Sequence, residues 1–304
     1  MAVPIVHHPA YVAPLPHRRG FPMNKYARVM QWLLERGLAE PTHCHLPEPA
    51  SRWWLELTHE STYIADICEG TASPEMMRRI GLPLSPELAE RASASVGGTV
   101  LAGRLALQRG IACNTAGGSH HAATAGGAGY CVFNDVAVAC RVLQAMGLAA
   151  SLLVIDLDVH QGDGTAEIFR GDAAVYTFSM HGEKNFPVRK QPGDRDVGLP
   201  DGTGDEAYLS ILAEQLDQIL GEQRPDLVFY NAGIDPHADD RLGRLALSDS
   251  GLARRDDMVI GACAERGLPI ACVLGGGYGG DAGVLADRHG LLYLAADRWY
   301  RTLA

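Results

Sequence analysis

The chain has 304 residues, of which 47% are hydrophobic and 20% are charged, a balance typical of a globular protein with a sizeable core. Its formal net charge of −10 argues against a nucleic-acid surface, and no apolar run approaches membrane-spanning length. Seven cysteines are scattered without a Cys-x-x-Cys pair, and the N-terminus does not read as a signal peptide. We therefore expect reduced thiols in a cytoplasmic protein, with neither nucleic acid nor membrane as a partner.

The first third of the chain predicts helices that follow an irregular N-terminal segment. Residues 4–24 are rich in proline, histidine and arginine and should lie irregularly against the body. Residues 25–36 have apolar side chains at helical spacing and are followed by glycine, which predicts a helix. Residues 85–108 begin with Ser-Pro and predict a second helix, with a break at the glycine pair 97–98. Between them, residues 56–64 resemble a strand end that leads into a short capped helix.

From residue 111 onwards, short apolar runs alternate with helical patterns. Such alternation favours parallel strands joined by helices. We expect strands at 111–114, 152–155, 174–179, 227–231 and 269–274, helices at 134–146, 166–169, 205–220, 251–266 and 282–294, and a glycine-containing irregular loop at 186–204. The predicted fold is one α/β domain over residues 1–304, with an open, mostly parallel sheet sandwiched by helices. Its active site should lie at the carboxyl ends of the strands.

The segment that follows the apolar run 152–155 carries the densest chemistry of the chain. Asp156, Asp158 and His160 follow one another in phase with the two-residue period of a strand, and Asp163 comes shortly after. Burying so many ionisable groups is costly unless they are paired or bind a metal ion. Oxygen and nitrogen ligands in this ratio suit zinc or another divalent first-row ion. The simpler interpretation is a capped strand end with solvated acids.

Three other strand ends carry unusual residues that should meet this segment at one edge of the sheet. They are the pair His120-His121, Asp235, and a tyrosine in a glycine-rich loop, Tyr278. Together with Asp158 and His160, Asp235 would give zinc three protein ligands and leave a position open for water. Each residue alone has a simpler structural interpretation, so the prediction depends on the joint pattern.

The remaining residues at this edge suit acid–base catalysis. Histidine is the usual general base, and two adjacent histidines cannot both be cationic at low cost, so their roles should differ. Asp156 and Asp163 are placed to hold the imidazole rings by hydrogen bonds. Tyr278 can donate a hydrogen bond to a developing oxyanion.

Taken together, these motifs resemble the zinc-dependent histone deacetylase superfamily, which also includes acetylpolyamine amidohydrolases and acetoin-utilisation proteins. The matching segments lie in the family's order at residues 117–121, 129–135, 156–164, 231–235 and 275–278. Further segments look most like the class IV branch and its bacterial relatives, at residues 17–26, 79–83 and 240–243.

The resemblance implies a role for each catalytic position. Zinc ligands are expected at three residues: Asp158, His160 and Asp235. The acid–base set comprises His121 as general base, His120 beside the leaving amine, Asp156 and Asp163 as their respective partners, and Tyr278 as the residue that polarises the carbonyl.

The resemblance also implies binding positions. Tyr130 and Phe186 match the aromatic pair that walls an acyl-lysine tunnel, with Gly129 and Gly276 beside it. Tyr130 departs from the family's common phenylalanine, so the acyl group or amine that fits here could differ. A structural K⁺ or Na⁺ site is expected at Asp156, Ser179 and the backbone near Met180.

The implied activity is a zinc-dependent amidohydrolase that removes an acetyl or other acyl group from a lysine-like amine in a peptide or protein. One alternative is a deacylase of acylpolyamines or another acylated small amine. A second is an arginase-like enzyme, which needs two manganese ions and more Asp and His ligands than this chain offers. A third is an inactive protein that binds acyl-lysine.

Overall fold

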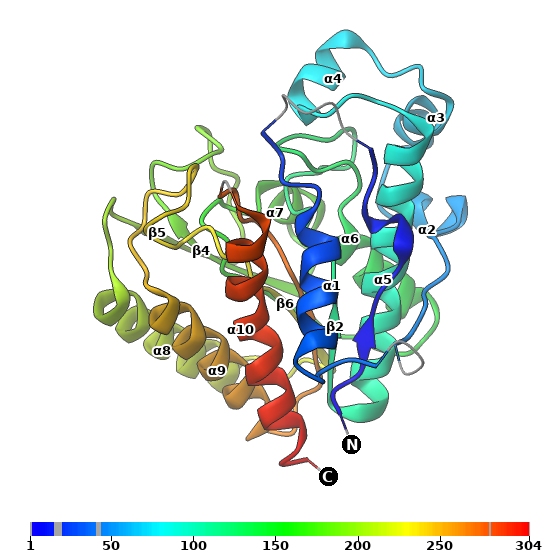
Figure 1. The fold of residues 1–304 in the computed structure, drawn as a ribbon. Helices are drawn as coiled ribbons and strands as arrows, with labels where there is room; N and C mark the ends of the chain where they lie inside the picture. The colour runs from blue at the N-terminus through cyan, green and yellow to red at the C-terminus, as the bar shows by residue number, and fades with distance from the viewer. Residues whose placement is uncertain (1, 15–19, 41–43, 280, 304) are drawn as a thin grey trace.

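A computed structural model describes residues 2–14, 20–40, 44–279 and 281–303, and its centre is a seven-stranded sheet in which all strand pairings are parallel (Figure 1). The strands are β1 (Ile5–Val6), β2 (Ile111–Asn114), β3 (Leu152–Asp156), β4 (Val175–Gly182), β5 (Arg195–Leu199), β6 (Leu227–Asn231) and β7 (Ile270–Val273). Their order across the sheet is β1-β2-β7-β6-β3-β4-β5. The α/β class with a parallel sheet, predicted from the alternating pattern, is confirmed.

Helices cover both faces of the sheet. The helices in the described part of the chain are α1 (Lys25–Glu35), α2 (Arg52–Glu56), α3 (Ser61–Glu69), α4 (Pro74–Ile80), α5 (Pro86–Arg109), α6 (Asp135–Ala145), α7 (Asp163–Ile168), α8 (Asp205–Glu222), α9 (Asp249–Ala264) and α10 (Ala282–Tyr300). Helices α1, α10, α9 and α8 pack side by side on one face, and α5 packs against α6 on the other (Figure 1).

The burial of the central strand β3 on both faces explains why its first four residues are all apolar. Leu153 and Ile155 belong to the hydrophobic core under α8, α9 and α10. Leu152 and Val154 belong to the core under α5 and α6. Because successive side chains of a strand point to opposite faces, a strand covered on both faces needs a continuous apolar run rather than an alternating one.

Strand register brings the ends of β3 and β6 to the same level. Asp156, the last residue of β3, pairs with Asn231 of β6 on one side and with Ser179 of β4 on the other. Strand β7 pairs with β6 on its far side, and β2 pairs with β7. The loops that leave β2, β3, β6 and β7 therefore emerge next to one another at the carboxyl edge of the sheet.

The predicted break in the long helix at Gly97-Gly98 is wrong, because α5 continues through both residues. A Cβ atom on Gly97 would collide with the backbone oxygen of Glu48, and one on Gly98 would collide with the hydroxyl of Tyr11. These glycines therefore permit close packing of the N-terminal segment on the helix, and they do not interrupt it.

Two other local predictions need correction. The strand end expected at residues 56–64 is absent, since α2 ends at Glu56 after a Ser51 N-cap and α3 follows from Ser61. The loop expected at 186–204 contains β5, an edge strand whose exposed side chains alternate with less exposed ones and so lack the apolar run of a buried strand. Helix α7 begins at Asp163 and ends at Ile168, earlier than the predicted 166–169, and α10 continues past the predicted 282–294 to Tyr300.

Part of the N-terminal prediction lies outside the described residues, namely positions 17–19 of the segment that resembles class IV members. Within residues 4–24, the irregular path is interrupted by β1 and by a 3₁₀ turn at Pro9–Tyr11. All seven cysteines are free thiols, as expected. No helix in the described part of the chain is long and apolar enough to cross a membrane.

A glycine substitution tests the packing of α5. Gly98→Ala should lower the free energy of unfolding by about 1–3 kcal/mol, because the added methyl group meets Tyr11 and Asn114 without free space. Gly221→Ala is the matched control, since a Cβ atom there has no neighbour within 4 Å, and it should stabilise helix α8 by up to about 1 kcal/mol. Urea unfolding of both variants makes the measurement, and equal effects of the two substitutions would contradict the packing role.

Candidate metal and catalytic centre

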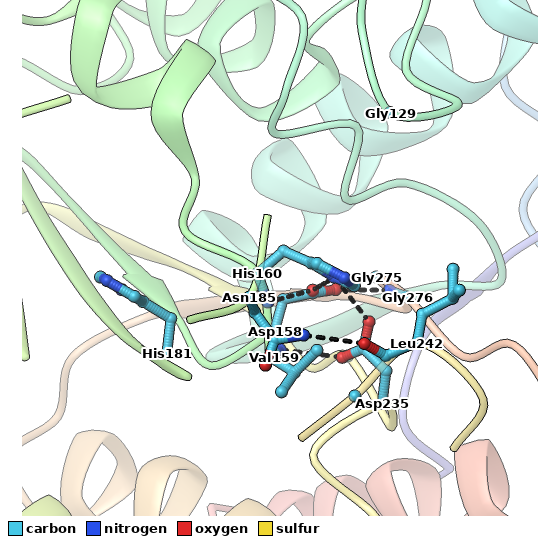
Figure 2. A network of polar contacts seen from close by, with 12 residues as sticks. Gly129, Asp158, Val159, His160, His181, Asn185, Asp235, Leu242, Gly275 and Gly276 are labelled. Atoms are coloured by element: carbon cyan, nitrogen blue, oxygen red, sulfur yellow. Dashed lines mark hydrogen bonds and ion pairs between the residues drawn. The ribbon is translucent and has the colours of Figure 1, made fainter. Parts of the chain in front are cut away.

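Three predicted metal ligands, Asp158, His160 and Asp235, form a buried cluster at the carboxyl edge of the sheet (Figure 2). One potential ligand atom from each lies within 4.8 Å of the others. The Nδ1 atom of His160 is 3.0 Å from Oδ1 of Asp158 and 3.1 Å from Oδ2 of Asp235. Asp158 and His160 come from the loop after β3, and Asp235 comes from the loop after β6, so the strand register assembles the cluster.

Neighbouring backbone amides hold the two carboxylates in place. The amide of Gly276 donates to Oδ2 of Asp158 at 2.7 Å, and the amide of Val159 donates to Oδ1 of Asp235 at 2.8 Å (Figure 2). A Cβ atom on Gly276 would collide with Oδ2 of Asp235, so only glycine permits this approach. The predicted position of Gly276 beside the site is thus explained by its contact with two ligand carboxylates.

The donor set fits a divalent cation. The Oδ2 atom of Asp235 is buried and makes no hydrogen bond within the described residues, which leaves a lone pair directed at the cluster. Burial and the charge of Asp158 raise the pKa of Asp235 to about 7. Burial alone would lower the pKa of His160, but the carboxylates of Asp158 and Asp235 outweigh it and raise this pKa to about 10. A bound zinc ion would replace this proton, and two oxygens with one imidazole nitrogen form a ligand set that zinc accepts at catalytic sites.

Two histidine–aspartate pairs lie beside the cluster. The Nδ1 atom of His120 is 2.6 Å from Oδ2 of Asp156, and the Nδ1 atom of His121 is 2.6 Å from Oδ1 of Asp163. The Nε2 atoms of the two rings face each other at 3.1 Å. Both partner assignments predicted for Asp156 and Asp163 match this geometry.

The two imidazoles differ in their affinity for a proton. Burial opposes charging of both rings, but Asp156 and Asp158 raise the pKa of His120 to about 9. For His121, burial and the positive charge of His120 lower the pKa to about 4. In the metal-free protein at neutral pH, these pKa values favour a charged His120 that donates through Nε2 and a neutral His121 that accepts.

Tyr278 stands over the cluster with its ring centroid 6.0 Å from that of His160. Burial, together with the charges of Asp158 and Asp235, raises its pKa well above the usual range, so its hydroxyl remains a hydrogen-bond donor. The backbone amide of Tyr278 donates to Oδ2 of Asp240 at 2.7 Å. Asp240 thus ties the loop after β7 to the loop after β6.

Aromatic side chains lie next to Tyr278 and His121. The ring of Tyr130 lies 5.7 Å from that of Tyr278, and Tyr130 has a positive φ of 67° beside Gly129. Phe186 meets the ring of His121 edge-on at 4.8 Å and is 44% exposed, so it borders both the catalytic histidine and solvent. The predicted tunnel residues therefore all adjoin the site, although Tyr130 and Phe186 contact different catalytic residues.

Gly129 is required by the packing of the catalytic base. Its φ is 53°, in the left-handed region, and a Cβ atom there would press against the ring of His121. Its amide donates to the carbonyl of Arg79, and that of Tyr130 donates to the carbonyl of Ile80. The loop that carries Tyr130 is therefore anchored to α4.

The residues predicted to hold a monovalent cation lie behind the catalytic pairs. Asp156 and Ser179 line a small cavity of about 10 Å³ together with Thr177 and Asp196, which is space for roughly one water-sized species. Ser179 bonds to Nδ1 of His181, whose ring points away from the metal cluster in Figure 2. Met180 is buried, and its side chain does not line this cavity. The K⁺ or Na⁺ site remains a prediction.

Some residues of the site were not predicted from the sequence. Lys25 is 1% exposed and donates to the carbonyl of Gly275, next to the catalytic tyrosine loop. Phe21 lies 5.2 Å from the ring of Tyr130 and 6.3 Å from that of Tyr278. Both come from the N-terminal segment, more than a hundred residues from their contacts, and no local spacing indicates such contacts.

Comparison with known proteins identifies the family. The histone deacetylase domain matches residues 20–286 of the chain. The chain belongs to the histone deacetylase family. Its resemblance to the class IV branch stays a prediction.

Relatives of this family cover most of the chain. An uncharacterised protein of Picosynechococcus sp. is 50% identical over 97% of this chain and 99% of its own length. Histone deacetylase 2 of Arabidopsis thaliana is 30% identical over 88% of this chain and 72% of its own length. A probable deacetylase of Archaeoglobus fulgidus is 29% identical over 86% of this chain and 76% of its own length. The crystal structure of a histone deacetylase homologue from Aquifex aeolicus has a TM-score of 0.82 at 23% identity, over 100% of this chain and 88% of that chain.

Removing one ligand tests the metal site. Asp158→Ala should lower bound zinc from about one ion per chain to a small fraction, because two protein ligands hold zinc far more weakly than three. Asp163→Asn is the control, because Asp163 lies at the same edge of the sheet but outside the ligand cluster. This variant should keep its zinc. Metal content of dialysed protein distinguishes the two, and full zinc loading of Asp158→Ala would exclude this cluster as the site.

Proposed function

We propose that this protein is a zinc-dependent deacylase that removes an acetyl or other acyl group from the ε-amine of lysine in peptides or proteins. The observation that carries the proposal is the buried Asp158–His160–Asp235 cluster next to two histidine–aspartate pairs. Only one potential ligand cluster is found among the described residues, which supports one metal ion per chain. An arginase-like enzyme would need ligands for a pair of manganese ions.

Zinc would supply a Lewis acid that polarises the amide carbonyl and lowers the pKa of bound water to about 7. The chain's own residues then move the protons. His121 is neutral and hydrogen-bonded through Nδ1 to Asp163, so its Nε2 atom is the one that would accept a proton from water. His120 carries a proton at neutral pH and can give it to the departing amine.

The hydroxyl of Tyr278 would stabilise the negative charge that develops on the carbonyl oxygen of the substrate. Its phenol stays protonated, and its ring stands next to the ligand His160. A hydroxyl in this place can donate to the carbonyl oxygen of a bound amide, and the bond strengthens as negative charge develops there.

The aromatic approach supports a substrate with a long apolar stem. The rings of Phe21 and Tyr130 lie beside Tyr278, and that of Phe186 lies beside His121, and such apolar surfaces would suit the methylene chain of lysine. A polyamine has a comparable stem, so acylpolyamines are the alternative substrate. We also propose that a K⁺ or Na⁺ ion occupies the cavity at Asp156 and Ser179, and that the enzyme works in the cytoplasm.

The proposal is tested with Tyr278→Phe and a panel of acyl-lysine peptides and acylpolyamines. The wild-type zinc protein should hydrolyse acetyl-lysine peptides, and Tyr278→Phe should lower kcat by about 10²- to 10³-fold, as expected for loss of one oxyanion donor. Substrate affinity and zinc content should change little, because the ring and its packing remain. Hydrolysis of acylpolyamines alone would reassign the substrate. Inactivity of the wild type on every substrate, with binding retained, would favour an acyl-lysine-binding protein.

Titration of the two histidines tests their division of roles. In the zinc-free protein, the NMR resonances of His120 should titrate near pH 9 and those of His121 near pH 4. Asp156→Asn removes a negative charge that favours the imidazolium, so the pKa of His120 should fall and its proton should be lost at lower pH. Asp163→Asn, whose side chain bonds to the other ring, should leave the pKa of His120 in place. A higher pKa for His121 than for His120 would reverse the assignment.

A further inference from the structure

A buried arginine lies beneath the two loops that carry the metal ligands. Arg255 belongs to α9 and has no exposed surface, which is rare for an arginine. Its guanidinium donates through Nη1 to the carbonyl of Gly233 at 2.5 Å and to that of Leu157 at 3.3 Å. The Nη2 atom reaches the carbonyl of Ala232 at 3.5 Å.

These carbonyls belong to the two separate loops of the metal cluster. Leu157 immediately precedes the ligand Asp158 in the loop after β3. Ala232 and Gly233 precede the ligand Asp235 in the loop after β6. One side chain therefore joins two segments more than seventy residues apart in sequence.

The arginine is itself held by other buried groups. Its Nε and Nη2 atoms donate to Oδ1 of Asp256 at 2.9 and 2.8 Å, and the hydroxyl of Tyr230 donates to the same oxygen at 2.6 Å. Tyr230 lies on β6, next to the strand end that leads to Asp235. These bonds from Nε and Nη2 to Asp256 fix the orientation of the planar guanidinium, so that Nη1 points to the carbonyls of Leu157 and Gly233.

We infer that Arg255 is a positioning residue that clamps the β3 and β6 loops at the spacing that the Asp158–His160–Asp235 cluster needs to bind its metal ion. The inference rests on the proposed zinc site. Buried carbonyls that lose their donor carry a desolvation cost, so without the guanidinium the loops should separate or rotate to find other partners. The planar guanidinium has several N–H donors and can bond to carbonyls of both loops at once, whereas a lysine ammonium in the same place would reach fewer carbonyls.

A simpler interpretation is that Arg255 and Asp256 form an ion pair that only stabilises the core. The two interpretations differ in what happens to the metal. A core ion pair affects the free energy of unfolding, but it has no reason to change metal affinity in the folded protein. A clamp changes metal affinity and ligand geometry, since residues that orient ligands typically contribute about 10- to 100-fold to metal affinity.

The experiment measures metal binding by three variants and the wild type. Arg255→Lys keeps the charge, and Arg255→Met combined with Asp256→Asn removes the pair without leaving a buried unpaired charge. Arg141→Met is the control, because it breaks a partly buried ion pair with Asp172 away from the site. Zinc affinity is measured by competition with a chelator, and Co²⁺ substitution adds an absorption spectrum that reports ligand geometry.

The clamp predicts about 10- to 100-fold weaker zinc binding and an altered Co²⁺ spectrum in the double variant, a smaller loss in Arg255→Lys, and wild-type values in Arg141→Met. Folded Arg255 variants with wild-type affinity and spectrum would overturn the clamp and leave the zinc site intact. A wild-type protein that binds no metal would overturn the zinc site and the clamp together.

A measurement on the wild type covers the case in which the Arg255 variants do not fold. Since coupling between two groups is reciprocal, zinc should slow amide hydrogen exchange in α9 around Arg255 as well as in the two ligand loops. Slower exchange in the loops alone, with α9 unchanged, would overturn the clamp.

Discussion

The burial of many ionisable groups at one edge of the sheet is the constraint on which the rest of the structure depends. Asp156, Asp158, His160 and Asp235 are nearly inaccessible to water, and isolated charges in such a place would be prohibitive. Each carboxylate has instead a specific partner, either an imidazole or a backbone amide, and His160 lies between the carboxylates of Asp158 and Asp235. The site is thus a closed polar network in which the imidazolium of His160 lies between the two ligand carboxylates, and a metal ion would take the place of its proton.

The fold supplies this network through strand register and small residues. Parallel pairing of β3 with β6 puts Asp156 level with Asn231, so the loops that follow start side by side. The backbone amide of Gly276 donates to Asp158, and only glycine can occupy this position because a Cβ atom there would collide with the carboxylate of Asp235. Arg255 joins the same two loops from below, so the cluster is held from several directions.

Much of the fold and most of the site could be predicted, because their signals are local. The run from Leu152 to Asp163 contains a buried strand, two ligands and two histidine partners within a dozen residues. The errors arose where long-range packing decides the structure. The glycine pair in α5 serves contacts with residues far along the chain, and β5 is an edge strand without an apolar run. Lys25 and Arg255 were missed, since a buried cation has no local sequence pattern.

On this basis, the carboxyl edge of the sheet should hold one metal ion between Asp158, His160 and Asp235. Anomalous diffraction from crystals of the zinc-loaded protein, collected on both sides of the zinc absorption edge, tests it most directly. A single strong anomalous peak per chain is expected, bounded by the carboxylates of Asp158 and Asp235 and by Nδ1 of His160. A pair of peaks within this edge, or a peak only at another place in the chain, would contradict it.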